Sequence, residues 1–440
     1  MYARRQIWNV SYPIFLSLLA QNIINVTDTA FLGRVGEVEL GASAIGGLYY
    51  ICMFTIAFGF SIGSQIIIGR RNGEGNYRAI GPVVIQGIFF LMLSALAMFL
   101  FSRLMADNMI RFLITSDKVG NATVEFLDWR VYGFFFSFLN VMFRAFFVGI
   151  TRTKVLTLNA LVMAIVNVIF DYLLIFGHAG FPQMGIKGAA IASLIAEGSS
   201  ILFFLIYTYR TVDLKKYGFN QFRSFDLRLL KQVLSISVFT MLQYFVAMST
   251  FFLFFMIVER IGERELAIAN IVRSIYILMF IPVNALSTTA NTLVSNIMGE
   301  GKINQVIPLI RKIAGISLGI MIPFVALLCL LPYHILSIYT NDSSLIMASV
   351  PSVYVIAIAG LFCSVSSVVF NALSGTGNTR SALMLELITL VVYVFSIYIM
   401  GIKFHQPVHI CFISEWIYYI GLFVNSLLYF RFFPWDKKKI

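Results

Sequence analysis

The chain has 440 residues, of which 59% are hydrophobic and 12% are charged, and it carries a net charge of +12. Soluble domains usually contain about 25% charged residues, so this composition excludes a protein whose whole surface faces water. We expect the positive charge to lie in loops beside membrane lipid, and we expect no nucleic-acid partner.

Apolar segments follow one another along the whole chain, and each is long enough to cross about 30 Å of hydrocarbon as a helix. The predicted spans are 7–33, 41–69, 78–102, 121–150, 155–177, 185–210, 228–259, 265–297, 303–331, 343–373, 380–402 and 406–432. The connections between them are short. The sequence therefore predicts an all-α membrane protein with twelve transmembrane helices.

Lysine and arginine residues indicate how these helices are oriented. With the N-terminus inside, most of the 32 basic residues fall in the even-numbered loops and at the two termini. Cytoplasmic loops of membrane proteins carry such an excess of Lys and Arg. We therefore predict a multi-pass protein of the cytoplasmic (inner) membrane with both termini in the cytoplasm.

An internal repeat divides the chain into two copies. A single ungapped register places 34–37 (RVGE) over 260–263 (RIGE), 73–75 (GEG) over 299–301 (GEG), and 153–154 (TK) over 379–380 (TR). Because each copy has an even number of helices, we predict six-helix lobes at 1–215 and 216–440 related by a parallel pseudo-two-fold axis. Such repeats are typical of transporters that rock two halves about a central site. A duplicated channel or membrane enzyme is the alternative.

Polar side chains within the first lobe are candidates for ion binding. A charged side chain at the bilayer centre costs about 2.5–3.5 kcal/mol or more, so intramembrane carboxylates are functional candidates. Asp28 and Asp171 are predicted at nearly the same depth, and Asn167 lies one turn before Asp171 on the same helical face. With Asn140 and Ser193, they form a candidate site for a proton or a hard cation such as sodium. The alternative for Asp171 is a hydrogen bond within its bundle.

Other polar residues have two interpretations each. Glu197 is predicted either to join the same cavity or to pair with Arg144. Glu386 and Glu415, in the second lobe, either bind a cationic substrate or serve as packing groups. Pro13 removes a backbone hydrogen bond from the first span, so it is a candidate hinge.

Short motifs recur along the chain in a fixed order. They are Pro13 with Asn25-Val26-Thr27-Asp28-Thr29 and Gly33, Gly-Glu-Gly at 73–75, Asn167-x-x-x-Asp171, and Gly185-x-x-Gly188-Ala189-Ala190. Together with the two six-helix lobes, they resemble the multidrug and toxic compound extrusion (MATE) family over essentially the whole chain.

The resemblance implies antiport, in which a proton or sodium ion enters while an organic, often cationic or amphipathic, compound leaves. In the branch named for DNA-damage inducibility, the essential aspartates are in the N-terminal lobe. Asp28 and Asp171 match those positions, and Asn140 and Asn167 match their polar neighbours, which makes these four the candidate sodium ligands. Ser193 stands where relatives often have threonine, and Pro13 matches the proline about which the first helix is thought to bend.

Another branch of the family uses carboxylates on helices 7 and 10. Here the seventh span offers Gln243, a candidate for the substrate cavity, and the tenth span has no acidic residue. We therefore expect coupling in the N-terminal lobe of a secondary active antiporter that functions as a monomer and needs no cofactor beyond its coupling ion.

Two further classes are weighed against this expectation. A lipid-linked oligosaccharide flippase of related architecture would line its cavity with arginines, whereas only Arg130, Arg144 and Arg273 are not assigned to a loop or a helix end. An intramembrane enzyme would need a nucleophile–base pair or a metal-ligand set, and the sequence shows neither pattern. We expect a transporter rather than an enzyme.

Overall fold

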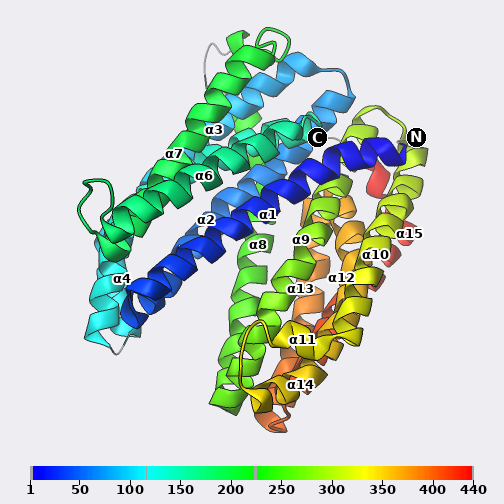
Figure 1. The fold of residues 1–440 in the computed structure, drawn as a ribbon. Coiled ribbons are helices and arrows are strands. Elements are labelled where there is room, and N and C mark those ends of the chain that lie inside the picture. The colour runs from blue at the N-terminus through cyan, green and yellow to red at the C-terminus, as the bar shows by residue number, and fades with distance from the viewer. Residues whose placement is uncertain (1–2, 115, 222–224, 439–440) are drawn as a thin grey trace. The chain divides into compact units, whose positions relative to one another are not determined.

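The computed structural model describes residues 3–114, 116–221 and 225–438. All regular secondary structure within these residues is helical (Figure 1). The main helices are α1 (Arg4–Val35), α2 (Glu37–Gly73), α3 (Ile80–Leu113), α4 (Asp117–Arg130), α5 (Gly133–Gly149), α6 (Lys154–Phe176), α7 (Gly185–Thr211), α8 (Leu227–Ile261), α9 (Glu263–Gly299), α10 (Val306–Leu330), α11 (Pro332–Leu336), α12 (Ser343–Gly375), α13 (Thr379–Ile397), α14 (Val408–Cys411) and α15 (Ile413–Phe432).

Most of these helices are long enough to cross a membrane. Among the described residues, 11 helical segments pass that test singly, and the bent pair α4–α5 brings the number to 12. The predicted all-α membrane fold is therefore confirmed. The short helix α11 lies outside this set, and α14 joins α15 in one span, Val408–Phe432.

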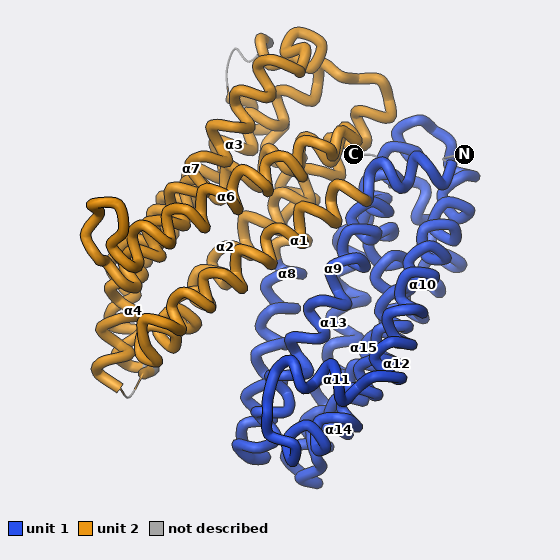
Figure 2. The backbone as a smooth tube through the Cα atoms, viewed as in Figure 1, with its two compact units in different colours: residues 1–11, 242–440 blue, residues 12–241 orange. Residues whose placement is uncertain are grey.

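Two compact units make up the chain: residues 12–241, and residues 1–11 together with 242–440 (Figure 2). The division falls within α1 and within α8, whereas the predicted lobe boundary lies in the loop at 215–216. The first part of α8 belongs to the unit that contains α2.

Two glycines of α2 allow the start of α8 to approach its backbone. A Cβ atom on Gly59 would lie 2.7 Å from the backbone nitrogen of Met241, and one on Gly63 would lie 2.5 Å from the Cα of Ser237. The hydroxyl of Thr240 donates to the carbonyl of Gly59 at 2.6 Å. Small residues spaced four apart are a common contact between membrane helices, because they let backbones pack closely.

The internal repeat is visible in the ends of the helices. The 37-residue helix α2 and the 37-residue helix α9 begin and end at matching positions of the repeat. Each is followed by a glycine in the left-handed region, Gly75 and Gly301, with φ of 71° in both. A left-handed glycine after the last helical turn lets the chain leave without strain.

One difference between the two copies concerns the fourth predicted span and its counterpart. α12 runs unbroken from Ser343 to Gly375, whereas the matching segment is divided into α4 and α5, which are inclined by 54°. The predicted span at 121–150 is therefore present but bent at residues 131–132. The N–H of Tyr132 donates to the carbonyl of Trp129, and that of Phe134 to Val131, so this segment tightens into three-residue turns just before and after Gly133.

Helices α6 and α7 lie side by side within their unit (Figure 1). Gly188, in the first turn of α7, makes the close approach possible, since a Cβ there would lie 2.7 Å from the carbonyl carbon and oxygen of Leu174. The N–H of Met184 also donates to the Leu174 carbonyl at 2.8 Å. This hairpin carries Asn167, Asp171 and Ser193, three of the five residues predicted for the ion site.

Gly188→Ala is expected to force α6 and α7 apart and to lower the free energy of unfolding by about 1–3 kcal/mol, the usual cost of overpacking. The matched control is Gly198→Ala in the same helix, where the nearest side-chain atom to the new methyl is 3.8 Å away. Melting temperatures of the detergent-purified variants check this. Equal melting temperatures for the two variants would contradict it.

Candidate functional site

A cavity of about 820 Å³ lies within the unit of residues 12–241, between α1, α2, α4, α5, α6 and α7. Its volume is in the range of small-molecule sites, and its wall combines apolar side chains with a few polar ones. The ionisable side chains in the wall, other than tyrosine, are Asp28, Glu37, Arg130, Arg144 and Glu197.

One side of the cavity carries two carboxyl groups bridged by an amide. With its amide nitrogen turned toward them, Asn167 donates to Asp28 Oδ1 at 2.9 Å and to Asp171 Oδ2 at 3.3 Å. The Asp28 and Asp171 carboxyls are also close enough to share a hydrogen bond. Asp171 is fully buried, and its Oδ1 has no hydrogen-bond partner among the described residues. Two adjacent carboxylates disfavour each other's charge, so such a pair is suited to hold a proton or a cation.

The positions of α1 and α6 explain why these residues meet. Asn167 and Asp171 are one turn apart and both face inward from α6, and Asp28 faces them from the C-terminal part of α1. Asp28, Asn167 and Ser193 line the cavity, and Asp171 lies directly behind Asn167 and Asp28. The structure therefore brings Asp28, Asn167 and Asp171 into contact, and the other two residues predicted for the ion site, Asn140 and Ser193, line the same cavity.

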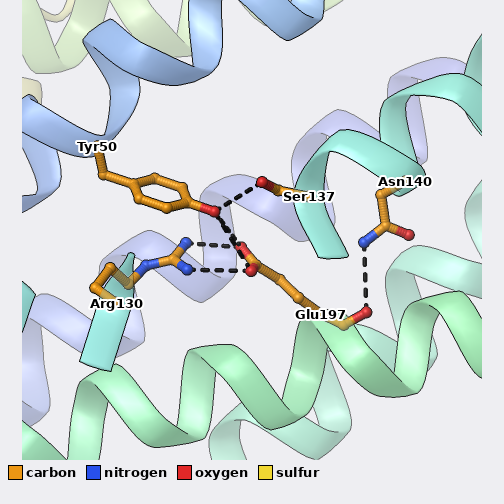
Figure 3. Close-up of polar contacts among 5 residues, drawn as sticks. All are labelled: Tyr50, Arg130, Ser137, Asn140 and Glu197. Carbon is orange, nitrogen blue, oxygen red and sulfur yellow. Dashed lines mark hydrogen bonds and ion pairs between the residues drawn. The ribbon is translucent and has the colours of Figure 1, made fainter. Parts of the chain in front are cut away.

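A second polar network is built on a buried ion pair (Figure 3). Arg130, the last residue of α4, binds the carboxylate of Glu197 on α7 with both terminal nitrogens, at 2.7 and 3.1 Å. Tyr50 donates its hydroxyl to Ser137 at 2.8 Å and lies 3.4 Å from Glu197 Oε1, and its ring covers the guanidinium at 3.6 Å. Bidentate pairing and stacking on an aromatic face are the two interactions for which arginine is best shaped.

Asn140 belongs to this second network. Its amide nitrogen donates to the backbone carbonyl of Glu197 at 3.4 Å (Figure 3). Its amide oxygen accepts from Ser200 at 2.7 Å, and the same hydroxyl lies 2.9 Å from Asn159 Oδ1. Asn140 lines the same cavity as Asp28, but its hydrogen bonds are made with α7 rather than with the two aspartates.

Glu197 pairs with a different arginine from the one named in the sequence analysis. Glu197 pairs with Arg130, and Arg144 instead lies over the ring of Phe58 at 5.5 Å. The reason is the break after α4, which directs the last side chain of that helix toward α7. Arg130 is the functional candidate that sequence reasoning missed.

Gly133 is the one sequence signal for this arrangement. A Cβ at this position would overlap the Arg130 guanidinium and lie 2.6 Å from Glu197 Oε2 and 2.9 Å from the Tyr50 hydroxyl. The ion pair therefore lies against bare backbone at the helix break. Next to Arg130 in the chain, the ring of Trp129 has Lys187 Nζ above it, 5.0 Å from the ring centre.

The remaining predicted cavity residues lie in the other unit. Glu386 is buried and accepts a hydrogen bond from Tyr418 at 3.1 Å, and Glu415 accepts one from Tyr393 at 2.7 Å. Gln243 is also buried. None of Gln243, Glu386 and Glu415 is among the described residues that line the cavity. A tyrosine hydroxyl thus donates to one oxygen of each glutamate.

Comparison with known proteins supports the architecture. The MatE family profile matches residues 13–173 and again 240–399, one match in each copy of the repeat. The chain is 23% identical over 444 residues to "Probable multidrug resistance protein NorM" of Thermotoga maritima, covering 99% of this chain and 94% of the relative. It is 25% identical over 386 residues to the protein of the same name from Agrobacterium fabrum, covering 86% and 82%.

Solved structures share the fold. One, described as the outward-facing conformation of a multidrug resistance MATE family transporter, superposes with a TM-score of 0.87 at 17% identity, covering 99% of this chain and 96% of the other. A transporter of the MOP superfamily from Pyrococcus furiosus, described as having a binding pocket of reverse polarity, also has a TM-score of 0.87 at 17% identity, covering 98% of this chain and 94% of the other. With the profile matched in both halves, the chain belongs to the MatE family, the multidrug and toxic compound extrusion transporters.

Proposed function

We propose that this chain is a secondary active antiporter that exports small organic compounds, often cationic or amphipathic, in exchange for protons or sodium ions. Members of its family are transporters rather than enzymes, and its relatives are named for multidrug resistance. The observation that carries the proposal is the pair of carboxyl groups, Asp28 and Asp171, joined by Asn167 at the wall of an 820 Å³ cavity.

The mechanism follows from the repulsion between two nearby carboxylates. A bound cation neutralises that repulsion and holds Asp28 of α1 against Asp171 of α6. When the cation leaves, repulsion favours moving α1 away from α6, which changes the shape of the cavity. Cation binding and substrate binding are thereby linked through one wall of the same space.

Asn167 can serve both states of the site. With its nitrogen toward the carboxylates, the amide stabilises them as hydrogen-bond acceptors while no cation is present. Rotated by half a turn, the same amide presents an oxygen beside the two carboxyl groups, and three oxygens of this kind suit a hard cation such as sodium. Asn140 supports a sodium site less well, because both ends of its amide are already bonded.

Pro13 gives α1 a place to bend. Proline has no N–H and cannot donate a hydrogen bond to the preceding helical turn. The carbonyl of Pro13 accepts a hydrogen bond from the hydroxyl of Thr157 on α6 at 3.0 Å. A hinge at this position, in the helix that carries Asp28, would let cation occupancy alter the course of α1.

We place the protein in the cytoplasmic membrane with both termini inside, surrounded by lipid and active as a monomer. A lipid-linked oligosaccharide flippase is not favoured, since the Arg130 guanidinium in the cavity wall is neutralised by Glu197 rather than offered to a pyrophosphate.

Asp28→Asn and Asp171→Asn are each expected to reduce gradient-driven dye efflux from proteoliposomes close to the level of liposomes without protein. The amide keeps the shape of the carboxyl but cannot exchange a cation. The control is Asp128→Asn, an identical change at an exposed ion pair with Arg103 outside the cavity, which should leave efflux unchanged. Wild-type efflux by the two cavity variants, at equal reconstituted amounts, would refute the assignment.

Imposing pH and sodium gradients independently on the same proteoliposomes identifies the coupling ion. Efflux driven by either gradient alone supports antiport. Efflux that proceeds equally without any cation gradient would contradict it.

Pro13→Ala is expected to restore a backbone hydrogen bond in α1, raise the melting temperature and slow efflux, since the helix becomes harder to bend. Pro351→Ala, within the unbroken helix α12, is the matched control and should raise stability without slowing efflux. Unchanged efflux rates in both variants would remove the hinge from the mechanism.

A further inference from the structure

The Arg130–Glu197 pair occupies the wall of the substrate cavity while its two charges cancel. The side chains are 13% and 11% exposed, so the pair is screened poorly by water yet faces the cavity. The charge of Arg130 also acts on Asp28, which lines the same cavity. Any imbalance in this pair would therefore be felt by a molecule bound in the cavity.

The pair and the helix break occur together and only in the first copy of the repeat. At the matching positions of the second copy, Arg130, Gly133 and Glu197 are replaced by Ile356, Ala359 and Phe423. The helix there, α12, is unbroken. Apolar residues are thus sufficient to pack this junction. An ion pair in the first copy is costly to bury, and packing alone does not account for it.

Because the Arg130–Glu197 pair has no net charge, the other ionisable residues set the charge of the cavity wall. Among the non-phenolic ionisable residues of the cavity wall, Asp28 and Glu37 are then opposed by Arg144 alone. A wall with this balance attracts an organic cation and disfavours a carboxylate. If Glu197 did not neutralise Arg130, a second guanidinium would face the cavity and balance the two carboxylates, which would remove that preference.

We propose that Arg130 and Glu197 are specificity-determining residues, which set the charge of the substrate by neutralising each other in the cavity wall. The inference rests on the proposed function, because it concerns the substrate of that same cavity. It traces the cationic preference of the proposed function to the charge that remains in the wall when the pair is neutral. It also means that the charge of the wall can be altered by mutation, since neutralising one partner leaves a charge of known sign on the other.

The test compares two dyes that differ in one group: rhodamine 6G, a monocation with an ethyl ester, and rhodamine 19, which has a carboxylate in its place. Binding to the purified full chain is measured by fluorescence anisotropy, without any ion gradient. Glu197→Gln leaves the charge of Arg130 unopposed and should shift the ratio of affinities toward the carboxylate dye by about tenfold, as expected for one charge at roughly 10 Å. Arg130→Gln should shift the ratio toward the monocation by a similar factor.

The double variant Arg130→Gln/Glu197→Gln keeps the wall neutral and should return the ratio close to that of the wild type. Opposite shifts that cancel distinguish charge selection from loss of structure, because misfolding would weaken both dyes in every variant. The matched controls are Arg103→Gln and Asp128→Asn, which break an exposed ion pair in the same unit. These should leave the ratio unchanged, since water screens them.

A ratio that stays the same in both single variants, or moves in the same direction in both, would overturn the inference. Either result would leave ion-driven export standing, because binding is measured without a gradient. Conversely, ratios that shift as expected while efflux ignores the cation gradients would remove the antiport proposal and retain charge selection by the pair.

Discussion

Hydrocarbon offers no partner to a polar group, so the buried polar side chains of residues 12–241 depend on one another for hydrogen bonds and charge balance. This constraint accounts for both networks of the cavity. Asn167 joins two carboxyl groups, and Tyr50 and Ser137 support a closed arginine–glutamate pair. The helices must place these partners within contact distance, and the close approaches at Gly133 and Gly188 serve that placement.

The repeat shows how one scaffold carries two kinds of interior. Helix boundaries agree between the copies at α2 and α9, yet the side chains at matching positions differ. Tyr276 and Tyr419, which share a hydrogen bond in the second unit, stand at the repeat positions of Tyr50 and Ser193 of the cavity. Tyr393 likewise stands where the first copy has Asn167. At two of these three positions, a bulky phenol in the second copy replaces a small polar group of the first.

Much of this architecture was predictable because membrane helices are constrained by length. The spans, the repeat and the equal depth of Asp28 and Asp171 follow from apolar segments of nearly uniform size, and the spacing of Asn167 from Asp171 follows from helical periodicity. The break at 131–132 was not predictable in the same way, since no proline marks it. The choice of Arg130 over Arg144 as the partner of Glu197 depends on that break. Only the contrast between Gly133 and its repeat counterpart Ala359 gave a signal.

The position of Trp129 has a practical consequence. Its indole precedes Arg130, lies beside Lys187 and is 38% exposed, at the point where α4 ends. Indole emission responds to nearby charge and to water, so this residue is a native fluorescent reporter for the bend. A chain in which the other tryptophans are replaced by phenylalanine would allow rearrangement at this junction to be followed in real time, without attaching an external label.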